Sequence, residues 1–403
     1  MDSTLGFLKS FFPERLHTQI FLAGGAVRDM LLGLGSTDID LAAALSPDEF
    51  LALGFRLVEG RSTSAIWFHH AADSGTMEVT PIRDATSLIE DLRRRDFCCN
   101  AMAMTLTGEI IDPLGGRDDL ECRQLRACSP RSFIDDPQRI FRAFRFLADG
   151  WRMSEETEGL IRQRDWTEAL AAIPVERFSR EMFKALGMRF PERFFESMLE
   201  FGIGRDCLPE IFRMPSIPAG PLEHHPEGDL FSHSVQVLQR VAGLSPDPLS
   251  RFCTFFHDIG KLATSPALYP RHHGHNESGS ALAIDFCRRL RLPAHYGNML
   301  ACISRLHGVF NTWDQLRDST RIATAEQAIK AGIAGILPMV SAADKGTTGE
   351  PVEWRAALQV AGMSAGDLGI DLDRLKEMQP SKRGDYILQQ RIRRFRSIRT
   401  SSV

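Results

Sequence analysis

The 403-residue sequence lacks the features that would place it in a membrane or a secretory pathway. It has no run of eighteen or more apolar residues, and residues 1–16 lack a basic region followed by an apolar core and a cleavage site. The eight cysteines form no CxxC pair and no regular framework. This pattern indicates reduced thiols and predicts a cytoplasmic protein without a membrane partner.

An overall positive charge is also missing, since the formal net charge is −4 and gives no global attraction to nucleic acid. The charge is unevenly distributed, however. Residues 376–403 hold eight Lys and Arg against Glu377 and Asp385, a net of +6, which leaves −10 on residues 1–375. This basic segment, interleaved with Phe and Ile, could follow a phosphate backbone. A solvated helix face is the alternative interpretation.

The apolar pattern changes along the chain. Up to about residue 112 the apolar runs are short and separated by Gly, Pro and Asp, which predicts a small α+β domain with helices at 26–32 and near 92–104. From Asp135 onward the spacing is helical, most clearly in residues 140–150, 157–173, 175–187 and 194–204. Residues 213–230, rich in Pro and Gly, indicate a linker into a second helical region.

The segment GGAVRDMLLGLGSTDID combines two features that are ordinary when taken singly. Gly24 and Gly25 would let the chain turn so that backbone N–H groups face outward at the start of the helix over 26–32. Asp38 and Asp40 follow on a second strand, where alternation places both side chains on one face. Two carboxylates this close repel unless a cation lies between them, and Mg²⁺ is the natural occupant. A pair of turn or capping aspartates is the alternative.

A third acid strengthens the metal interpretation. Glu78 lies between Met77 and Val79 in a strand-like run, so it points away from the apolar face. Taken alone, it would be read as a solvated strand residue. Three carboxylates on neighbouring strands beside a glycine turn indicate a two-metal site for phosphoryl transfer, with catalytic roles for Asp38, Asp40 and Glu78.

Six motifs occur along the chain in the order GGAVRD, DID, RRRDFCCNAMAM, IIDPLGG, DDPQRIFRAFRF and VERFSREM. Their order and spacing over residues 20–190 resemble class II tRNA nucleotidyltransferases, the CCA-adding family and its bacterial poly(A) polymerase relatives. The resemblance implies a polymerase-β-like head with a mixed or antiparallel sheet, followed by an all-helical neck, body and HD-type tail. The implied bounds are 1–114 for the nucleotidyltransferase head, 115–190 for the neck with the nucleotide-recognition motif, 191–222 for the body and linker, 223–350 for the HD phosphohydrolase domain and 351–403 for the basic helical tail.

The resemblance also implies roles for single residues. Asp38 and Asp40 correspond to the metal-binding aspartates, and Glu78 to the strand acid that completes the site. The residues implied in nucleotide binding are Gly24, Gly25, Arg28, Arg94, Arg95, Asp96, Asn100, Asp136, Arg139, Arg142 and Arg145. Within this set the family's aspartate can sense the ribose 2′-OH; a solvated basic face is the alternative for the arginines at 93–95. The candidate tRNA contacts are the basic tail, Arg142, Arg145, Arg177 and Arg180.

The DDPQR motif places Asp136 and Arg139 three residues apart at the expected start of a helix, with Pro137 suited to its first turn. A carboxylate beside a guanidinium can read the Watson–Crick edge of C or A and reject U and G. That arrangement resembles the family's protein template for the incoming nucleotide. The family usually has Glu-Asp where this chain has Asp135-Asp136, and a plain salt bridge at a helix end is the alternative.

Only residues 79–93 separate Glu78 from Arg94. Full CCA-adding members carry a longer, flexible segment in this interval, which helps their site switch from CTP to ATP, and CC-adding members lack it. The short interval therefore predicts addition of two C residues. A full CCA-adding enzyme with a shortened loop is the alternative.

The second helical region contains His233, the pair His257-Asp258, and Asp344, in the H…HD…D order of HD-type phosphohydrolases. Imidazole and carboxylate ligands suit Ni²⁺, Mn²⁺, Fe or Zn better than Mg²⁺, and one or two such ions could activate a water. Four more histidines could complete the site or contact a phosphate, or could be polar loop residues: His272, His273, His275 and His307. His275 and His307 are the favoured accessory residues.

The segments TSPALYPRHHGH and SAADKGTTG resemble the tail of CCA-adding enzymes of gammaproteobacterial type. That resemblance implies 2′,3′-cyclic phosphodiesterase, 2′-nucleotidase and phosphatase activities. The leading interpretation is thus template-independent addition of CMP, with AMP as an open second step, to the 3′ end of tRNA. The expected partners are tRNA, CTP and ATP, with Mg²⁺ at the transferase site. The alternatives are a poly(A) polymerase, an RNA-binding or metal-sensing protein with a degenerate head, and an HD phosphohydrolase that uses its head to grip RNA.

Overall fold

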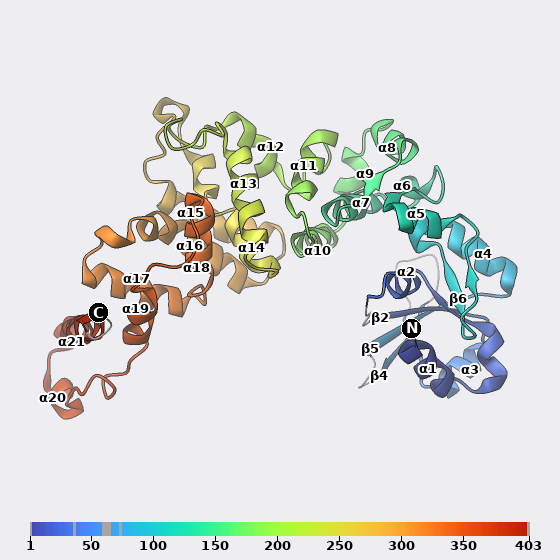
Figure 1. Ribbon diagram of the computed structural model, residues 1–403, viewed down its shortest axis with the longest axis horizontal. Coiled ribbons are helices and arrows are strands. Elements are labelled where there is room, and N and C mark those ends of the chain that lie inside the picture. The colour runs from blue at the N-terminus through green and yellow to red at the C-terminus, as the bar shows by residue number, and fades with distance from the viewer. Residues whose placement is uncertain (1, 35–37, 59–65, 72–74, 401–403) are drawn as a thin grey trace. The chain divides into compact units, whose positions relative to one another are not determined.

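The computed structural model describes residues 2–34, 38–58, 66–71 and 75–400 (Figure 1). The chain divides into two compact units, residues 1–170 and 171–403. The finer division into head, neck, body, HD domain and tail stays a prediction.

A seven-stranded sheet organises the first unit, with the strand order β3-β4-β5-β2-β1-β6-β7. The strands are β1 (Ile20–Ala23), β2 (Asp38–Ala43), β3 (Arg56–Val58), β4 (Ile66–Ala71), β5 (Gly75–Pro81), β6 (Ala103–Thr105) and β7 (Ile110–Ile111). Strands β2 and β5 are parallel and the other neighbouring pairs are antiparallel. The sheet is therefore mixed, which confirms the predicted α+β class.

Helices and two short strands complete the first unit. They are α1 (Asp2–Phe11), η1 (Glu14–Gln19), α2 (Gly25–Leu31), α3 (Pro47–Ala52), α4 (Ala85–Arg93), η2 (Cys98–Asn100), α5 (Gly116–Cys122), β8 (Gln124–Leu125), α6 (Ser132–Asp135), α7 (Arg139–Ala148), β9 (Arg152–Met153), α8 (Glu155–Arg162) and α9 (Thr167–Ala171). The prediction of a helix near residues 92–104 is wrong. Helix α4 ends at Arg93, and the segment after it forms the short 3-10 helix η2 and the strand β6.

Strand alternation separates the two faces of the sheet. Ile39 and Leu41 of β2 and Met77 and Val79 of β5 are buried in one core with side chains of α1 and α3. On the opposite face, Ala42 belongs to a smaller cluster that includes Leu88 and Leu92 of α4. Asp40 and Glu78 alternate with the large apolar residues and so lie on this second face.

The second unit is helical (Figure 1). Its helices are α10 (Val175–Leu186), α11 (Glu192–Phe201), α12 (Pro209–Arg213), η3 (Met214–Ser216), α13 (Leu230–Ala242), α14 (Pro248–Phe255), η4 (Ile259–Ala263), η5 (Pro266–Leu268), α15 (His275–Arg289), α16 (Ala294–Asn311), η6 (Trp313–Gln315), α17 (Asp318–Lys330), α18 (Ile336–Lys345), α19 (Trp354–Ala361), α20 (Leu372–Glu377) and α21 (Pro380–Thr400). The helical spacing read from residues 175–187 and 194–204 is confirmed by α10 and α11.

The Pro- and Gly-rich segment 213–230 is more than a spacer. Met214, Ile217 and Ala219 are buried, and Pro218 forms a bridge with Asp229 just before α13. This segment packs into the second unit and contributes side chains to the histidine cluster described below. Among the described residues, no helix combines the length and the apolar character needed to cross a bilayer.

Candidate active sites

The first candidate site lies where β1 turns into α2 beside β2 and β5. Gly24 precedes α2 with a φ of 71°, a conformation that favours glycine. A Cβ at this position would lie 3.5 Å from Oδ2 of Asp40 and 2.1 Å from Nη1 of Arg95. The glycine thus lets a carboxylate and a guanidinium approach the turn closely.

Asp40 and Glu78 are partners in the parallel register of β2 and β5. Paired residues on neighbouring parallel strands point to the same face, so both carboxylates face the side of the sheet opposite the main core. Asp38 begins β2 and pairs with Thr76, but its side chain lies outside the described part of the structure. Two of the three predicted acids are therefore brought together, and the third occupies the expected strand position.

A polar network joins α2 to the segment after α4. Arg28 donates to Oδ1 of Asn100 at 2.6 Å, and Asn100 donates to Oδ1 of Asp96 at 3.0 Å. Nε of Arg142 lies 2.8 Å from Oδ2 of Asp96 in an ion pair. Burial would raise the pKa of Asp96, but Arg142 and Asn100 hold it below its usual value. Four predicted nucleotide-binding residues therefore form one connected unit.

Arg139 at the start of α7 reaches back to the same segment. Its guanidinium donates to the carbonyl oxygens of Arg94 at 2.8 Å and of Arg95 at 3.3 Å. Asp136 lies between α6 and α7 and accepts from the backbone N–H of Gln138 at 3.2 Å. Helix α7 begins at Arg139 rather than near Pro137, so the motif spans the junction of two helices. Arg145 packs its guanidinium over the Phe146 ring, 4.9 Å from the centroid.

The basic C-terminal segment forms helix α21. Nε of Arg396 lies 2.6 Å from Asp318, and Nε of Arg399 lies 2.6 Å from Glu353. These arginines therefore stabilise the helix against the rest of the unit. Arg393 and Arg394 are exposed on the same helix.

The second candidate site is a cluster of histidines and aspartates in the second unit. Nε2 of His233 lies 3.2 Å from Oδ1 of Asp344 and 3.7 Å from Oδ2 of Asp258. Nε2 of His257 lies 3.4 Å from the same oxygen of Asp258 and 3.9 Å from Asp344. Each of the two histidines predicted from the H…HD…D order thus lies within 4 Å of both predicted aspartates.

His275 and His307 lie on the other side of Asp258. Their Nε2 atoms are 3.4 Å and 3.2 Å from Oδ1 of Asp258. His272 is directed elsewhere, because its ring contacts the carbonyl of Pro218 and the hydroxyl of Thr264, and His273 is exposed. The accessory pair named from the sequence therefore joins the cluster, whereas its two neighbours do not.

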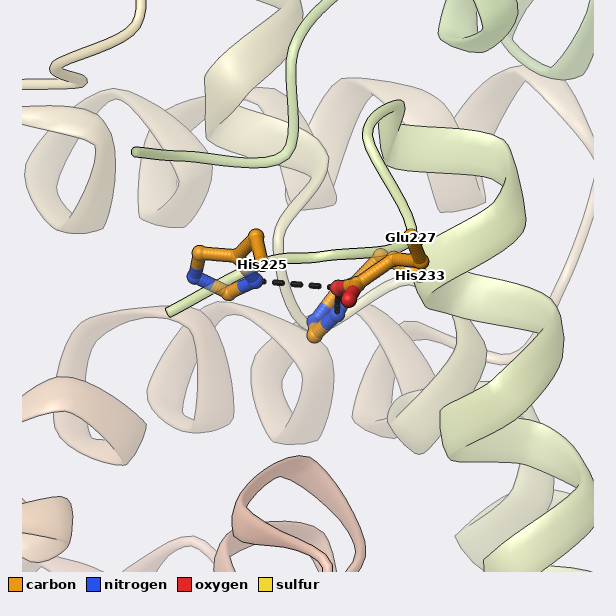
Figure 2. Close-up of side chains that lie close together, drawn as sticks. All are labelled: His225, Glu227 and His233. Atoms are coloured by element: carbon orange, nitrogen blue, oxygen red, sulfur yellow. Dashed lines mark hydrogen bonds and ion pairs between the residues drawn. The ribbon is translucent and has the colours of Figure 1, made fainter. Parts of the chain in front are cut away.

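Outer partners fix the orientation of the first histidine. Nδ1 of His233 contacts Glu227 at 2.6 Å, and the same carboxylate oxygen contacts Nδ1 of His225 at 3.0 Å (Figure 2). Asn311 donates to Oδ2 of Asp344 at 2.7 Å, which leaves Oδ1 facing the histidines. No local sequence pattern points to Glu227, since it lies in a Pro- and Gly-rich segment six residues before His233.

The HDIG sequence allows close packing at the centre of this site. A Cβ at Gly260 would lie 1.9 Å from the backbone oxygen of His275 and 2.6 Å from the backbone N of Gly279. Only a glycine lets helix α15 come this near to η4. The contact holds His275 beside Asp258.

Charges in the cluster favour ionised carboxylates but act differently on the imidazoles. Burial opposes protonation of His233 and His307, yet the neighbouring carboxylates of Asp344 and Asp258 raise the pKa of both rings. Burial lowers the pKa of His257 to about 4, so this ring is neutral at neutral pH. Burial opposes ionisation of Asp258, but Lys261 at 2.6 Å and the neighbouring histidines hold its pKa well below the usual range. Lys261 also donates to the carbonyl of Ala219.

The donor set fits a divalent cation. Among the described residues, three buried atoms form no hydrogen bond although they face the centre of the cluster: Nε2 of His233, Nε2 of His257 and Oδ1 of Asp258. Ligand atoms bound at about 2.0–2.2 Å to one cation lie roughly 3–3.5 Å apart, close to several of the separations found here. His233, His257 and Asp258 form one group that could hold a metal ion.

Comparisons with known proteins extend over both units. Residues 20–126 match the family model described as the Poly A polymerase head domain. A protein from Methylococcus capsulatus named Multifunctional CCA protein is 37% identical over 322 residues, which are 75% of this chain and 75% of that protein.

Two solved structures share the fold. The Thermotoga maritima CCA-adding enzyme complexed with tRNA has a TM-score of 0.63 and 20% identity, over 97% of this chain and 90% of that one. The Bacillus stearothermophilus CCA-adding enzyme in complex with CTP has a TM-score of 0.62 and 24% identity, over 100% and 93%.

Proposed function

The chain belongs to the class II CCA-adding enzyme family, tRNA nucleotidyltransferases that add nucleotides to the tRNA 3′ end, and we propose that its own transfer site is the Asp40–Glu78 face. The pairing of these carboxylates beside Gly24 and Arg95 is the observation that carries the proposal. We assign Asp38 to the same site from its strand position. Mg²⁺ held there would neutralise charge on the triphosphate and favour ionisation of the attacking 3′-OH.

The arginines beside this face supply the nucleotide contacts. Arg95, next to the Gly24 turn, and Arg28, in the last turn of the short helix α2, offer guanidinium donors to phosphate oxygens. Asp136 and Arg139 read the Watson–Crick edge of C or A, and Arg139 is bonded to the carbonyls of the two arginines that follow α4. Hydrogen bonds thus join the segment that would read the base to the segment that would bind the phosphates.

The expected partners are tRNA, CTP and ATP, as in the names of the structural relatives. Exposed arginines suit contacts to the tRNA backbone, which must be independent of sequence because many tRNAs are substrates. The candidates are Arg177 and Arg180 on α10 and Arg393 and Arg394 on α21. The eight free cysteines suit a reducing compartment, and we propose the cytoplasm.

The short interval between Glu78 and Arg94 supports the addition of CC. Strand β5 ends at Pro81 and α4 begins at Ala85, so only residues 82–84 connect them. Asp84 and Ser87 form a capping box that fixes the start of α4. The interval is occupied by regular structure, which leaves no extended segment to reshape the pocket for ATP.

The product formed from tRNA lacking CCA, with CTP and ATP both present, tests this proposal. We expect a tRNA ending in CC, with no further extension on addition of more ATP. A product ending in CCA would contradict CC-only addition and would identify a full CCA-adding enzyme, as the name of the Methylococcus relative suggests.

We propose that the histidine–aspartate cluster hydrolyses 2′,3′-cyclic or terminal phosphates at RNA ends. The assembly of His233, His257, Asp258 and Asp344 carries this proposal. A divalent transition metal such as Ni²⁺ or Mn²⁺ would supply a Lewis acid and an activated water there. Such an activity would restore the 3′-OH that the transferase needs.

Hydrolysis of 2′,3′-cyclic AMP by the full chain tests the second activity. We expect His257→Ala to abolish it and His273→Ala to leave it unchanged, because His273 is exposed outside the cluster. Hydrolysis that survives His257→Ala would contradict the assignment.

A further inference from the structure

Two cysteines from distant parts of the first unit lie next to each other where the segment after α4 meets the segment after β8. Phe97 and Ala127 form an antiparallel bridge, and the residues that follow them are Cys98 and Cys128. Backbone hydrogen bonds of 2.9 Å and 3.1 Å flank this bridge on both sides. Successive side chains alternate between faces, so both thiols point away from the bridged side chains and are diagonal neighbours on one face.

The two thiols interact with each other. Sγ of Cys98 lies 3.7 Å from the carbonyl oxygen of Ala127, the residue immediately before Cys128. A hydrogen bond from the Cys128 thiol lowers the pKa of Cys98, and the guanidinium of Arg126 acts in the same direction. The same contact, together with burial, raises the pKa of Cys128. Cys98 thus has the character of a thiolate, and Cys128, which is partly exposed, is the second thiol beside it.

Cys98 belongs to the segment that carries the proposed nucleotide-binding network. It lies between Asp96 and Asn100, whose side chains are joined by a hydrogen bond of 3.0 Å. The carbonyl oxygen of Asp96 accepts from the backbone N–H of Cys128 at 3.1 Å, so both cysteines are bonded to this segment. A covalent change at the two sulfurs therefore acts directly on the backbone that positions Asp96 and Asn100.

A disulfide at this position would displace the segment. Diagonal neighbours in an antiparallel ladder have Cα atoms about 7–8 Å apart, whereas a relaxed disulfide needs about 5.5–6 Å. The backbone of Cys98 has little free space, because a Cβ added at Gly116 would lie 2.1 Å from its carbonyl oxygen. Closing the S–S bond therefore requires the segment from Asp96 to Asn100 to shift, and a bond closed in this way is readily reduced.

We propose that Cys98 and Cys128 are a peroxide-sensitive thiol pair whose oxidation to a disulfide lowers the affinity of the chain for nucleotide. The Cys98 thiolate attacks one oxygen of hydrogen peroxide, the O–O bond breaks, and a sulfenic acid and one water result after proton uptake. Cys128 then attacks the sulfenic sulfur, the S–S bond forms, and the oxygen leaves as a second water. The two thiols lose two electrons, and a dithiol reductant returns them. Such a transient disulfide is compatible with a reducing compartment.

Mass spectrometry of the oxidised full chain tests the thiol pair without any reference to activity. The protein is treated with hydrogen peroxide, blocked with N-ethylmaleimide and digested with trypsin. We expect residues 96–117 to be linked to residues 127–131, with fragment ions that place the bond on Cys98 and not on the adjacent Cys99. Dithiothreitol applied before blocking should remove the link.

CTP binding and CMP incorporation test the consequence, which rests on the proposed transfer function. The oxidised chain should bind CTP at least about 10-fold more weakly than the reduced chain, and dithiothreitol should restore the affinity and the rate of incorporation. Cys128→Ser should keep the affinity of the reduced chain after peroxide treatment. Cys122→Ser, which changes an exposed cysteine, should remain as sensitive as wild type.

Absence of the Cys98–Cys128 bond in wild type, under conditions that oxidise the exposed Cys122, would overturn the thiol pair. A mapped bond with unchanged CTP affinity would overturn its effect on the nucleotide site, and so would equal losses of affinity in wild type and Cys128→Ser. A reduced chain that binds CTP but incorporates no CMP would contradict the transfer function instead, while the difference in CTP affinity between the two redox forms would still decide the proposal.

Discussion

Asp40 on β2 lies directly opposite Glu78 on the parallel strand β5. Both side chains alternate with residues of the main core, so both carboxylates face the same side of the sheet. Oδ2 of Asp40 also lies near the Gly24 turn, where the guanidinium of Arg95 approaches. The carboxylates that would bind a metal ion and the guanidinium that would bind a phosphate therefore lie close together.

Gly24→Ala should lower CMP incorporation by about 10²-fold, because the new Cβ would displace the Arg95 guanidinium from the turn. Gly33→Ala is a matched control. Gly33 has the same φ of 71°, but no described atom lies within 4 Å of its Cβ position. It should lose about 1–2 kcal/mol of stability through backbone strain while keeping its activity. Steady-state incorporation of labelled CMP measures the activity of both variants. Equal losses of activity in Gly24→Ala and Gly33→Ala would contradict a local role for Gly24.

Asp96→Asn should destabilise the chain at pH 6 by about 1–3 kcal/mol, since it leaves Arg142 without its charged partner. The folded-state pKa of Asp96 is lowered, so the stability gained from its ionisation is complete above the ordinary value of 3.8 and is lost as pH falls through the lower folded value. In thermal unfolding measured from pH 6 to pH 3, the difference in stability between wild type and Asp96→Asn should therefore shrink as the pH falls. Asp118→Asn changes an exposed carboxylate and should have the stability of wild type throughout this range. A stability difference between wild type and Asp96→Asn that grows in acid would contradict the ion pair.

Glu227→Gln should weaken Mn²⁺ binding at the histidine cluster by about 10–100-fold. The carboxylate accepts from Nδ1 of His233 and so keeps Nε2 directed toward Asp258 and Asp344. An amide holds that ring less firmly and carries no charge. Isothermal titration in an Asp40→Ala background, which removes metal binding at the transferase face, measures the effect, with the exposed Glu223→Gln as control. Unchanged affinity in Glu227→Gln would show that the contact is only structural.

Gly260→Ala should abolish cyclic AMP hydrolysis without altering any proposed ligand. Its Cβ would overlap the backbone of His275 and Gly279, so α15 must move away from η4 and carry His275 with it. Gly335→Ala, where no described atom lies within 4 Å of the added carbon, should keep full activity. Hydrolysis rates of the two variants decide the point, and wild-type activity in Gly260→Ala would contradict the close packing.

Local patterns in the sequence were sufficient to place much of the transferase face. Strand alternation alone predicts that the side chains of Asp40 and Glu78 point to one face of the sheet. It predicts that Ile39, Leu41 and Val79 point to the other face, and the structure shows this arrangement. The order of the histidines and aspartates likewise predicts the cluster around Asp258. Asp40 and Glu78 lie in regular strands, and His257 and Asp258 are adjacent in a short motif, so each pair can be recognised locally.

Other contacts depend on the tertiary fold and left no local signal. Glu227 lies in a Pro- and Gly-rich segment, so only the packing of that segment against α13 brings it to His233. The segment after α4 was expected to continue a helix, yet the backbone N–H of Cys98 donates to the carbonyl oxygen of Arg126 at 2.9 Å and the chain enters β6. Sheet pairing there outweighs helical propensity.

Incorporation of labelled CMP into tRNA lacking CCA tests the central assignment of the transferase site most directly. Asp40→Ala and Glu78→Gln should each lower the rate by about 10³-fold, because several kcal/mol of charge stabilisation is lost. Glu90→Gln, an exposed acid on α4, should match wild type. Near-wild-type incorporation by a folded Asp40→Ala or Glu78→Gln protein would contradict the account.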